Sequence, residues 1–185
     1  GEPLRLGSLG RLHRVKGYDV LIAALARLHA EGFTPPAPFS IALAGEGAER
    51  DALAAAAHAA GVADRLALPG YVEQPRDFLA GLHLYLQPSR SEGLCIAAHE
   101  SMQAGLASIV SAVGELPYGV EDGVTGLVVP PADPQALAGA LARLLADPAR
   151  LAPMGAAARA RVLDRLGRDA FIENGRAVLA RIAGA

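Results

Sequence analysis

The chain has 185 residues, of which 52% are hydrophobic and 19% charged, so it is long and apolar enough to bury the core of one domain. The formal net charge is −2, with lysines and arginines spread along the chain, which argues against nucleic acid as a partner. The single cysteine, Cys95, excludes an internal disulfide and a cysteine-clustered metal site, and it favours a reducing compartment, the cytoplasm. No apolar run approaches the roughly 20 residues that span a bilayer. The chain begins in a strand-like segment without a signal-peptide pattern, so we expect a domain excised from a longer protein.

Short apolar runs alternate along the chain with longer segments in which apolar residues recur at helical spacing. The short runs predict six strands, at residues 4–9, 40–44, 66–68, 82–86, 107–111 and 127–129. The longer segments predict helices at about 20–28, 49–60, 77–80, 94–103, from 134, from 148 and from about 168 to the C-terminus.

Several residues indicate where these helices begin and end. Gly61 stands where a C-cap glycine belongs, and Asp133 before Pro134 is typical of an N-cap. Asp147 before Pro148 repeats that arrangement. Strands that alternate with helices predict an α/β fold: a single Rossmann-like domain over residues 1–185, with a mostly parallel sheet and helices on both faces. Such sheets bind ligands beyond the carboxyl ends of their strands, so the loops after the strands are the place to look for chemistry.

The first such loop runs from Gly10 to Gly17 and carries two well-placed cations. Glycines permit a tight turn, and the helix that follows begins with free N–H groups at the positive end of its dipole. Arg11 can grip two phosphate oxygens, and Lys16 can act as a point charge. These parts suit a diphosphate. The alternative is that both are solvated surface cations, which is the better interpretation for a Gly-Arg-Leu string taken alone.

The loop after the fourth strand carries a second group of candidates. Gly93 lets the backbone come close to a ligand, and the N–H groups of Leu94, Cys95 and Ile96 are candidate phosphate donors. Glu92 in the loop can accept hydrogen bonds from a sugar, and Glu100 inside the following helix from a ribose. Each acid has an alternative: Glu92 can simply favour the helix dipole, for about 0.3–1 kcal/mol, and Glu100 can face solvent. Cys95 is interpreted as a small packed residue and not as a nucleophile.

These two groups, in this order, resemble the C-terminal domain of family 4 glycosyltransferases of the GT-B fold. The family has Gly-Arg-Leu, three residues and Lys-Gly after its first strand, then Pro-Ser, a short gap and two glutamates separated by seven residues. The matching residues here are Gly10-Arg11-Leu12, Lys16-Gly17, Pro88-Ser89, Glu92 and Glu100. Similar residues continue through Val113-Gly114, Pro117, Asp122-Gly123, Thr125-Gly126-Leu127 and Pro130-Pro131, so the resemblance covers nearly the whole chain.

The resemblance implies roles for these residues in a retaining glycosyltransferase whose donor is a nucleotide-diphosphate sugar. Arg11 and Lys16 would hold the diphosphate, together with Gly10 and the backbone amides after Gly93. Glu92 would contact the transferred sugar, and Glu100 the ribose. Gly45 and Gly47 would line the nucleotide pocket, with the Gly70-Tyr71-Val72 stretch by the base. It also implies no metal at the diphosphate and no cofactor beyond the donor.

The resemblance further implies a missing partner domain. A GT-B enzyme works in the cleft between two domains, so we expect an absent N-terminal domain that binds a carbohydrate or glycolipid acceptor and alone could touch a membrane. The last helix, 168–185, would pack partly against it and leave apolar residues partly exposed here: Phe171, Ile172, Val178, Leu179 and Ile182. The excised domain by itself would transfer nothing.

Six positions depart from the family pattern. Glu115 replaces a glycine, Tyr118 a glutamate, Leu94 an aromatic residue, Cys95 a glycine, His83 an aspartate and Ser101 an alanine. The departures at Glu115 and Tyr118 keep open a non-catalytic nucleotide-sugar-binding or regulatory module of the same fold. A nicotinamide-dependent enzyme is disfavoured, because no Gly-x-Gly-x-x-Gly turn follows the first strand.

Overall fold

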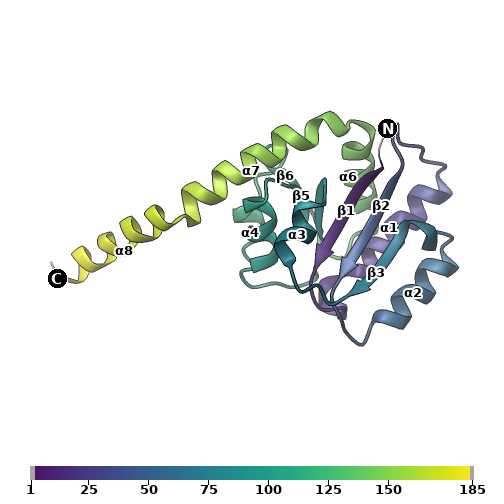
Figure 1. Ribbon diagram of the computed structural model, residues 1–185, viewed down its shortest axis with the longest axis horizontal. Coiled ribbons are helices and arrows are strands. Elements are labelled where there is room, and N and C mark those ends of the chain that lie inside the picture. Colours follow the sequence, from purple (N-terminus) through teal and green to yellow (C-terminus); the bar gives the residue numbers. More distant parts are fainter. Residues whose placement is uncertain (1–2, 184–185) are drawn as a thin grey trace.

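The computed structural model describes residues 3–183, apart from the side chains of Leu166 and Phe171. Its centre is a six-stranded sheet whose neighbouring strands are all parallel, in the order β3-β2-β1-β4-β5-β6 (Figure 1). The strands are β1 (Leu4–Leu9), β2 (Phe39–Ala44), β3 (Leu66–Gly70), β4 (Leu84–Gln87), β5 (Ala107–Ser111) and β6 (Gly126–Val129). The predicted single Rossmann-like domain with a parallel sheet is confirmed.

Helices cover both faces of this sheet. The longer ones are α1 (Tyr18–Ala30), α2 (Arg50–Ala59), α4 (Ile96–Gln103), α6 (Pro134–Ala146), α7 (Leu151–Leu166) and α8 (Arg168–Ala183). The short ones are α3 (Pro75–Ala80), α5 (Leu116–Gly119) and the 3-10 turns η1 (Arg14–Lys16), η2 (Ala63–Arg65) and η3 (Pro148–Arg150).

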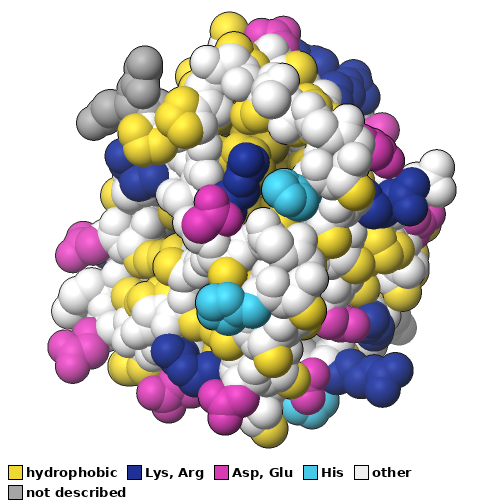
Figure 2. All heavy atoms as spheres, turned by 90° about the vertical axis from the view of Figure 1, so that its right-hand side faces the viewer, with side chains coloured by type: hydrophobic (Ala, Val, Ile, Leu, Met, Phe, Trp, Pro, Cys, Tyr) yellow, Lys and Arg dark blue, Asp and Glu magenta, His cyan; other side chains and the backbone are white. Residues whose placement is uncertain are grey.

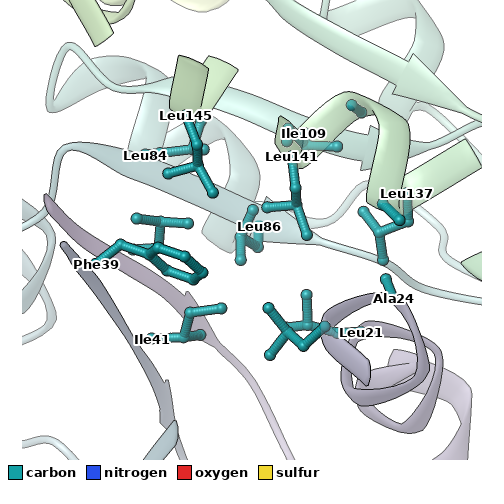
Figure 3. Close-up of a cluster of buried hydrophobic side chains, with 14 of the residues drawn as sticks. Leu21, Ala24, Phe39, Ile41, Leu84, Leu86, Ile109, Leu137, Leu141 and Leu145 are labelled. Atoms are coloured by element: carbon teal, nitrogen blue, oxygen red, sulfur yellow. The ribbon is translucent and has the colours of Figure 1, made fainter. Parts of the chain in front are cut away.

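The side chains of β4 point alternately to the two faces of the sheet and so belong to two separate cores. Leu84 and Leu86 point into the larger core, beneath α1 and α6, while Tyr85 belongs to the smaller core on the opposite face. Figure 3 shows the larger core, in which leucines of α1 and α6 close over Ile41 of β2 and Ile109 of β5. Burying each such side chain contributes about 1.5–3 kcal/mol, so these layers fix the positions of the strand ends.

The smaller core lies under α3, α4 and α7. It includes Leu79 of α3, Met102 of α4 and Val162 of α7, each 2% exposed or less, packed against Tyr85 and Val110 of the sheet. Because α4 belongs to this core, its N-terminus is held rigidly at the carboxyl edge of the sheet.

The predicted helix ends are confirmed in two places and wrong in two others. The Asp133 side chain accepts a hydrogen bond from the Ala136 N–H at 2.9 Å, and Gly61 follows α2 in the left-handed conformation. The Asp147 side chain, however, makes no capping hydrogen bond, and Pro148 begins the 3-10 turn η3 before α7 starts at Leu151. The helix predicted from residue 94 begins at Ile96.

The last helix, α8, continues from α7 and projects away from the rest of the molecule (Figure 1). Its side chains at Ile172, Val178, Leu179 and Ile182 are between 37% and 70% exposed. The Phe171 side chain, which the sequence also placed on this apolar face, lies outside the described residues. Packing of this helix against another domain stays a prediction.

Candidate functional site

The loops after β1 and β4 meet where the strand order reverses, which is the ligand-binding position of doubly wound sheets. Their contact depends on Gly17, whose φ of 67° lies in the left-handed region. A Cβ at Gly17 would lie only 1.9 Å from the Pro88 carbonyl oxygen. The Arg90 N–H donates to the Val15 carbonyl at 2.8 Å, so the two loops share backbone as well as side-chain contacts.

An ion pair between Arg90, in the loop after β4, and Asp19, at the start of α1, adds to this contact. The Arg90 guanidinium donates to both carboxylate oxygens of Asp19, at 2.6 and 2.7 Å. The hydrogen bond from Arg90 lowers the pKa of Asp19 below its usual range. The two-pronged geometry fixes the loops relative to each other more firmly than a single contact would.

The centre of the contact holds the two residues that the sequence singled out most strongly. The Lys16 ammonium lies 2.7 Å from Oε1 of Glu92, and the two side chains are only 18% and 10% exposed. The Ser89 hydroxyl and the Gln87 amide donate to the same Oε1, at 2.6 and 2.9 Å. The structure thus brings Lys16 and Glu92 together from loops 76 residues apart.

A hollow of about 580 Å³ opens beside this ion pair, at the carboxyl ends of β1 and β2 and the start of α4. Its volume suits a small-molecule ligand. Six predicted residues line it: Gly10, Arg11, Gly45, Tyr71, Ile96 and Glu100. Val72, from the stretch predicted to lie by the base, also lines it, and the sequence reasoning gave no role to the others, which are Leu9, Ala44, Glu46, Pro75 and Ala97.

Lys16 and Glu92 lie beside this hollow and are not part of its lining. A Cβ on Gly10 would come within 3.3 Å of Cε of Lys16, so the lysine stem runs just behind the hollow's edge. Gly47 is also outside the lining. A Cβ there would lie 2.1 Å from the Leu12 carbonyl, and one on Gly45 would lie 2.0 Å from the Gly10 carbonyl. Both glycines therefore let the loop after β2 press against the loop after β1.

The start of α4 faces the hollow through Ile96 and Ala97. The first-turn N–H groups of a helix have no partner within the helix, so they are available to an anion. Cys95 precedes this turn with φ 53° and ψ 70°, a left-handed conformation that is uncommon outside glycine. Its side chain is buried, and burial raises the pKa of the thiol to about 11, so it is neutral at pH 7 and packs as predicted. Gly93 and Leu94 lie in the loop before it, with Leu94 53% exposed.

The positions that depart from the family pattern have distinct surroundings. The Glu115 N–H donates to the Gly93 carbonyl at 3.1 Å, so this loop supports the Glu92 loop through its backbone. Tyr118 is 68% exposed and is not a packed core residue. His83 has a structural role, because its Nδ1 accepts from the Arg5 N–H at 3.0 Å.

Two broader features were searched for in the part of the chain that the structure describes. No cluster of three or more His, Cys, Asp or Glu residues suited to a metal ion occurs among residues 3–183. No helix within these residues is both long enough and apolar enough to cross a membrane. On the face shown in Figure 2, basic and acidic side chains are intermixed without a continuous basic stripe.

Comparison with known proteins adds an independent line of argument. Residues 3–147 match the family described as "Glycosyl transferases group 1", so the chain belongs to this family. A D-inositol 3-phosphate glycosyltransferase of Xylanimonas cellulosilytica is 36% identical over 156 residues, which cover 82% of this chain and 36% of that protein. The chain spans between 34% and 44% of the length of the curated relatives it matches.

Two solved structures show the same fold. The C-terminal domain of a group 1 glycosyl transferase, LpcC, from Francisella tularensis superposes with a TM-score of 0.77 at 21% identity, covering 89% of this chain and 87% of that one. Anabaena HepE in complex with UDP superposes with a TM-score of 0.83 at 22% identity, covering 99% of this chain and 49% of that one. The chain therefore matches the C-terminal domain of a GT-B glycosyltransferase.

Proposed function

We propose that this chain is the donor-binding domain of a retaining glycosyltransferase and binds a nucleotide-diphosphate sugar. The observation that carries the proposal is the Lys16–Glu92 pair beside a hollow of about 580 Å³, at the reversal point of the sheet. Arg11 and the first turn of α4 border the same hollow, so positive charge faces it from two elements, the loop after β1 and the helix α4. The UDP complex of the Anabaena neighbour is consistent with a nucleoside diphosphate as ligand.

In this proposal the protein stabilises the departing diphosphate. The bond between the anomeric carbon and the β-phosphate oxygen breaks, a bond to an acceptor oxygen forms on the same face of the sugar, and the proton of the acceptor hydroxyl passes to the departing diphosphate. The negative charge that develops on the diphosphate is met by Arg11, Lys16 and the helix amides, which would take the place of a metal ion. Glu92 accepts hydrogen bonds from the transferred sugar, and Glu100, which lines the hollow, accepts them from the ribose.

The remaining partners follow from the family. The acceptor, a carbohydrate or glycolipid, would bind to an N-terminal domain across the cleft, and contact with a membrane would occur only through that domain. The 185-residue chain by itself would bind the donor without transferring sugar.

Replacing Glu92 by Ala in the full-length enzyme tests the proposal. We expect most of the turnover to be lost while circular dichroism and the thermal midpoint show an intact fold, because the carboxylate touches the sugar. Wild-type turnover in this variant would contradict the role of Glu92.

A second candidate function is a non-catalytic nucleotide-sugar-binding or regulatory module, which the departures at Glu115 and Tyr118 favour. Sugar transfer assayed with a panel of donors separates the two. Donor binding without transfer by the full-length protein would favour the module.

A further inference from the structure

A chain of polar side chains lies buried at the end of β4, behind Glu92. Tyr85, Gln87 and Ser89 alternate along the strand end and are each 0% exposed. Burial of an amide without a hydrogen-bond partner costs about 1–3 kcal/mol, so the strand carries this glutamine only because its partners are present. Within the described residues, no buried side-chain nitrogen or oxygen lacks a partner.

Tyr85 fixes which way the amide of Gln87 points. Its hydroxyl donates to Oε1 of Gln87 at 2.7 Å. Burial raises the pKa of Tyr85 well above its usual range, so the phenol keeps the proton that it donates. Nε2 of Gln87 is thereby turned to Ser89 and Glu92, at 2.8 and 2.9 Å. The opposite orientation would place the amide carbonyl oxygen against the Glu92 carboxylate, so the carboxylate and the Tyr85 hydroxyl favour the same orientation of the amide.

Glu92 receives three donors on one oxygen. Lys16, Gln87 and Ser89 all contact Oε1, at 2.7, 2.9 and 2.6 Å. Three donors on one oxygen restrict the orientation of the carboxylate. The second oxygen, Oε2, is then the one left to accept a hydrogen bond from a ligand.

We propose that Gln87, oriented by Tyr85, is a positioning residue that holds the Glu92 carboxylate with Oε2 directed to the bound sugar. The inference rests on the proposed function of Glu92. It differs from a purely structural role for the buried amide, which would affect folding of the strand end but would not distinguish a nucleotide from a nucleotide sugar.

The test compares Gln87→Met, Tyr85→Phe and Thr125→Val. Thr125→Val is the matched control, since Thr125 is also buried, at 2% exposed, and its hydroxyl accepts from the Glu121 N–H at 2.8 Å away from the site. Affinities of this chain for UDP, GDP and ADP and for UDP-glucose, GDP-mannose and ADP-glucose are measured by calorimetry. Turnover is measured in the full-length protein with the donor that binds.

For Gln87→Met we expect an unchanged affinity for the nucleoside diphosphate but a fall in kcat of about 10- to 100-fold, the effect of one hydrogen bond to a charged group. Tyr85→Phe should act in the same direction and add little to Gln87→Met, because both act through one amide. Thr125→Val should lower only the thermal midpoint.

A further variant, Gln87→Glu, supplies a pH signature. Its protonated carboxyl group can donate to Glu92 as the amide does, whereas its ionised form cannot. Its turnover relative to wild type should therefore rise as the pH falls. A pH-independent ratio, or equal loss of nucleotide affinity and turnover in Gln87→Met, would overturn the inference while leaving the function of Glu92 intact. Failure of the wild-type chain to bind any of the six ligands would overturn both proposals.

Discussion

Lys16 is placed to contact two anions, the Glu92 carboxylate and the proposed diphosphate. In the structure its ammonium pairs with Glu92, yet the proposed diphosphate would lie in the hollow just beyond its stem. In the proposed complex the diphosphate would therefore compete with Glu92 for the same cation and would also be repelled by the carboxylate. The affinity for a nucleoside diphosphate would reflect this balance.

Glu92→Gln should separate binding from catalysis. It keeps an oxygen acceptor for Lys16 but removes a unit charge, worth about 1.7 kcal/mol at about 10 Å and an effective dielectric constant of about 20. We expect the affinity for the nucleoside diphosphate to rise about tenfold in calorimetry. Turnover of the full-length enzyme should fall. Unchanged or weaker nucleotide binding by this variant would show that Glu92 does not compete for the cation.

Cys95 offers a test of backbone strain at the start of α4. Its left-handed conformation is unfavourable for a side chain branched at Cβ, so Cys95→Val should destabilise the fold by about 1–3 kcal/mol. Cys95→Gly should be nearly neutral, because relief of strain offsets the loss of a buried side chain. Urea unfolding of the two variants measures the difference. Equal stability of the valine variant and the wild type would contradict this interpretation.

At the scale of elements, the sequence predicts the strands well because apolar runs broken by glycine and proline are local signals. It fails where long-range contacts shape the backbone. Residues 94 and 95 fit a helical pattern, but the loop containing them is tied down by the hydrogen bond from Glu115 to Gly93, so α4 begins at Ile96. The order of the motifs predicts Lys16 and Glu92 as site residues, although no local sequence pattern predicts that their side chains form an ion pair. Gln87 received no role although Tyr85 and Glu92 are only two and five residues away, because the apolar pattern of the strand does not show which way its amide points.

The ion pair between Arg90, in the loop after β4, and Asp19, at the start of α1, gives a pH-dependent prediction. The pKa of Asp19 is lowered from its ordinary value of 3.8 by Arg90, so the folded state binds this proton less readily than the unfolded state. The pair therefore contributes stability above pH 3.8, and this contribution is lost as the pH falls through the lower pKa of the folded state. Because the Asp19 side chain is 47% exposed, the contribution is small.

Thermal midpoints of wild type and Asp19→Asn, measured from pH 6 to pH 2.5, test this prediction. The wild type should be the more stable at pH 6, and the two curves should converge in acid. A difference that stays constant with pH would assign the effect of the substitution to something other than the charge of Asp19.

At the scale of the whole molecule, two features stand out: the candidate site at the carboxyl edge of the sheet and the projecting helix α8. The hollow, the Lys16–Glu92 pair and the start of α4 all lie at the carboxyl edge. The helix α8 carries its exposed apolar side chains away from the sheet (Figure 1). The chain spans less than half the length of the curated relatives it matches, and both features agree with the proposed arrangement, in which this domain faces a second one.

The most direct test of donor binding is a calorimetric titration of this chain with UDP, GDP and ADP. We predict saturable binding of at least one of them, weakened about 100- to 10,000-fold by Arg11→Ala with Lys16→Ala, because two charge-assisted contacts to phosphate are lost. Arg27→Ala serves as the control, because it also removes one positive charge. Arg27 is an exposed residue of α1 that pairs with Glu31, so this variant should bind as the wild type does. No binding of any of the three by folded wild-type protein, or binding indifferent to the Arg11 and Lys16 substitutions, would contradict the account.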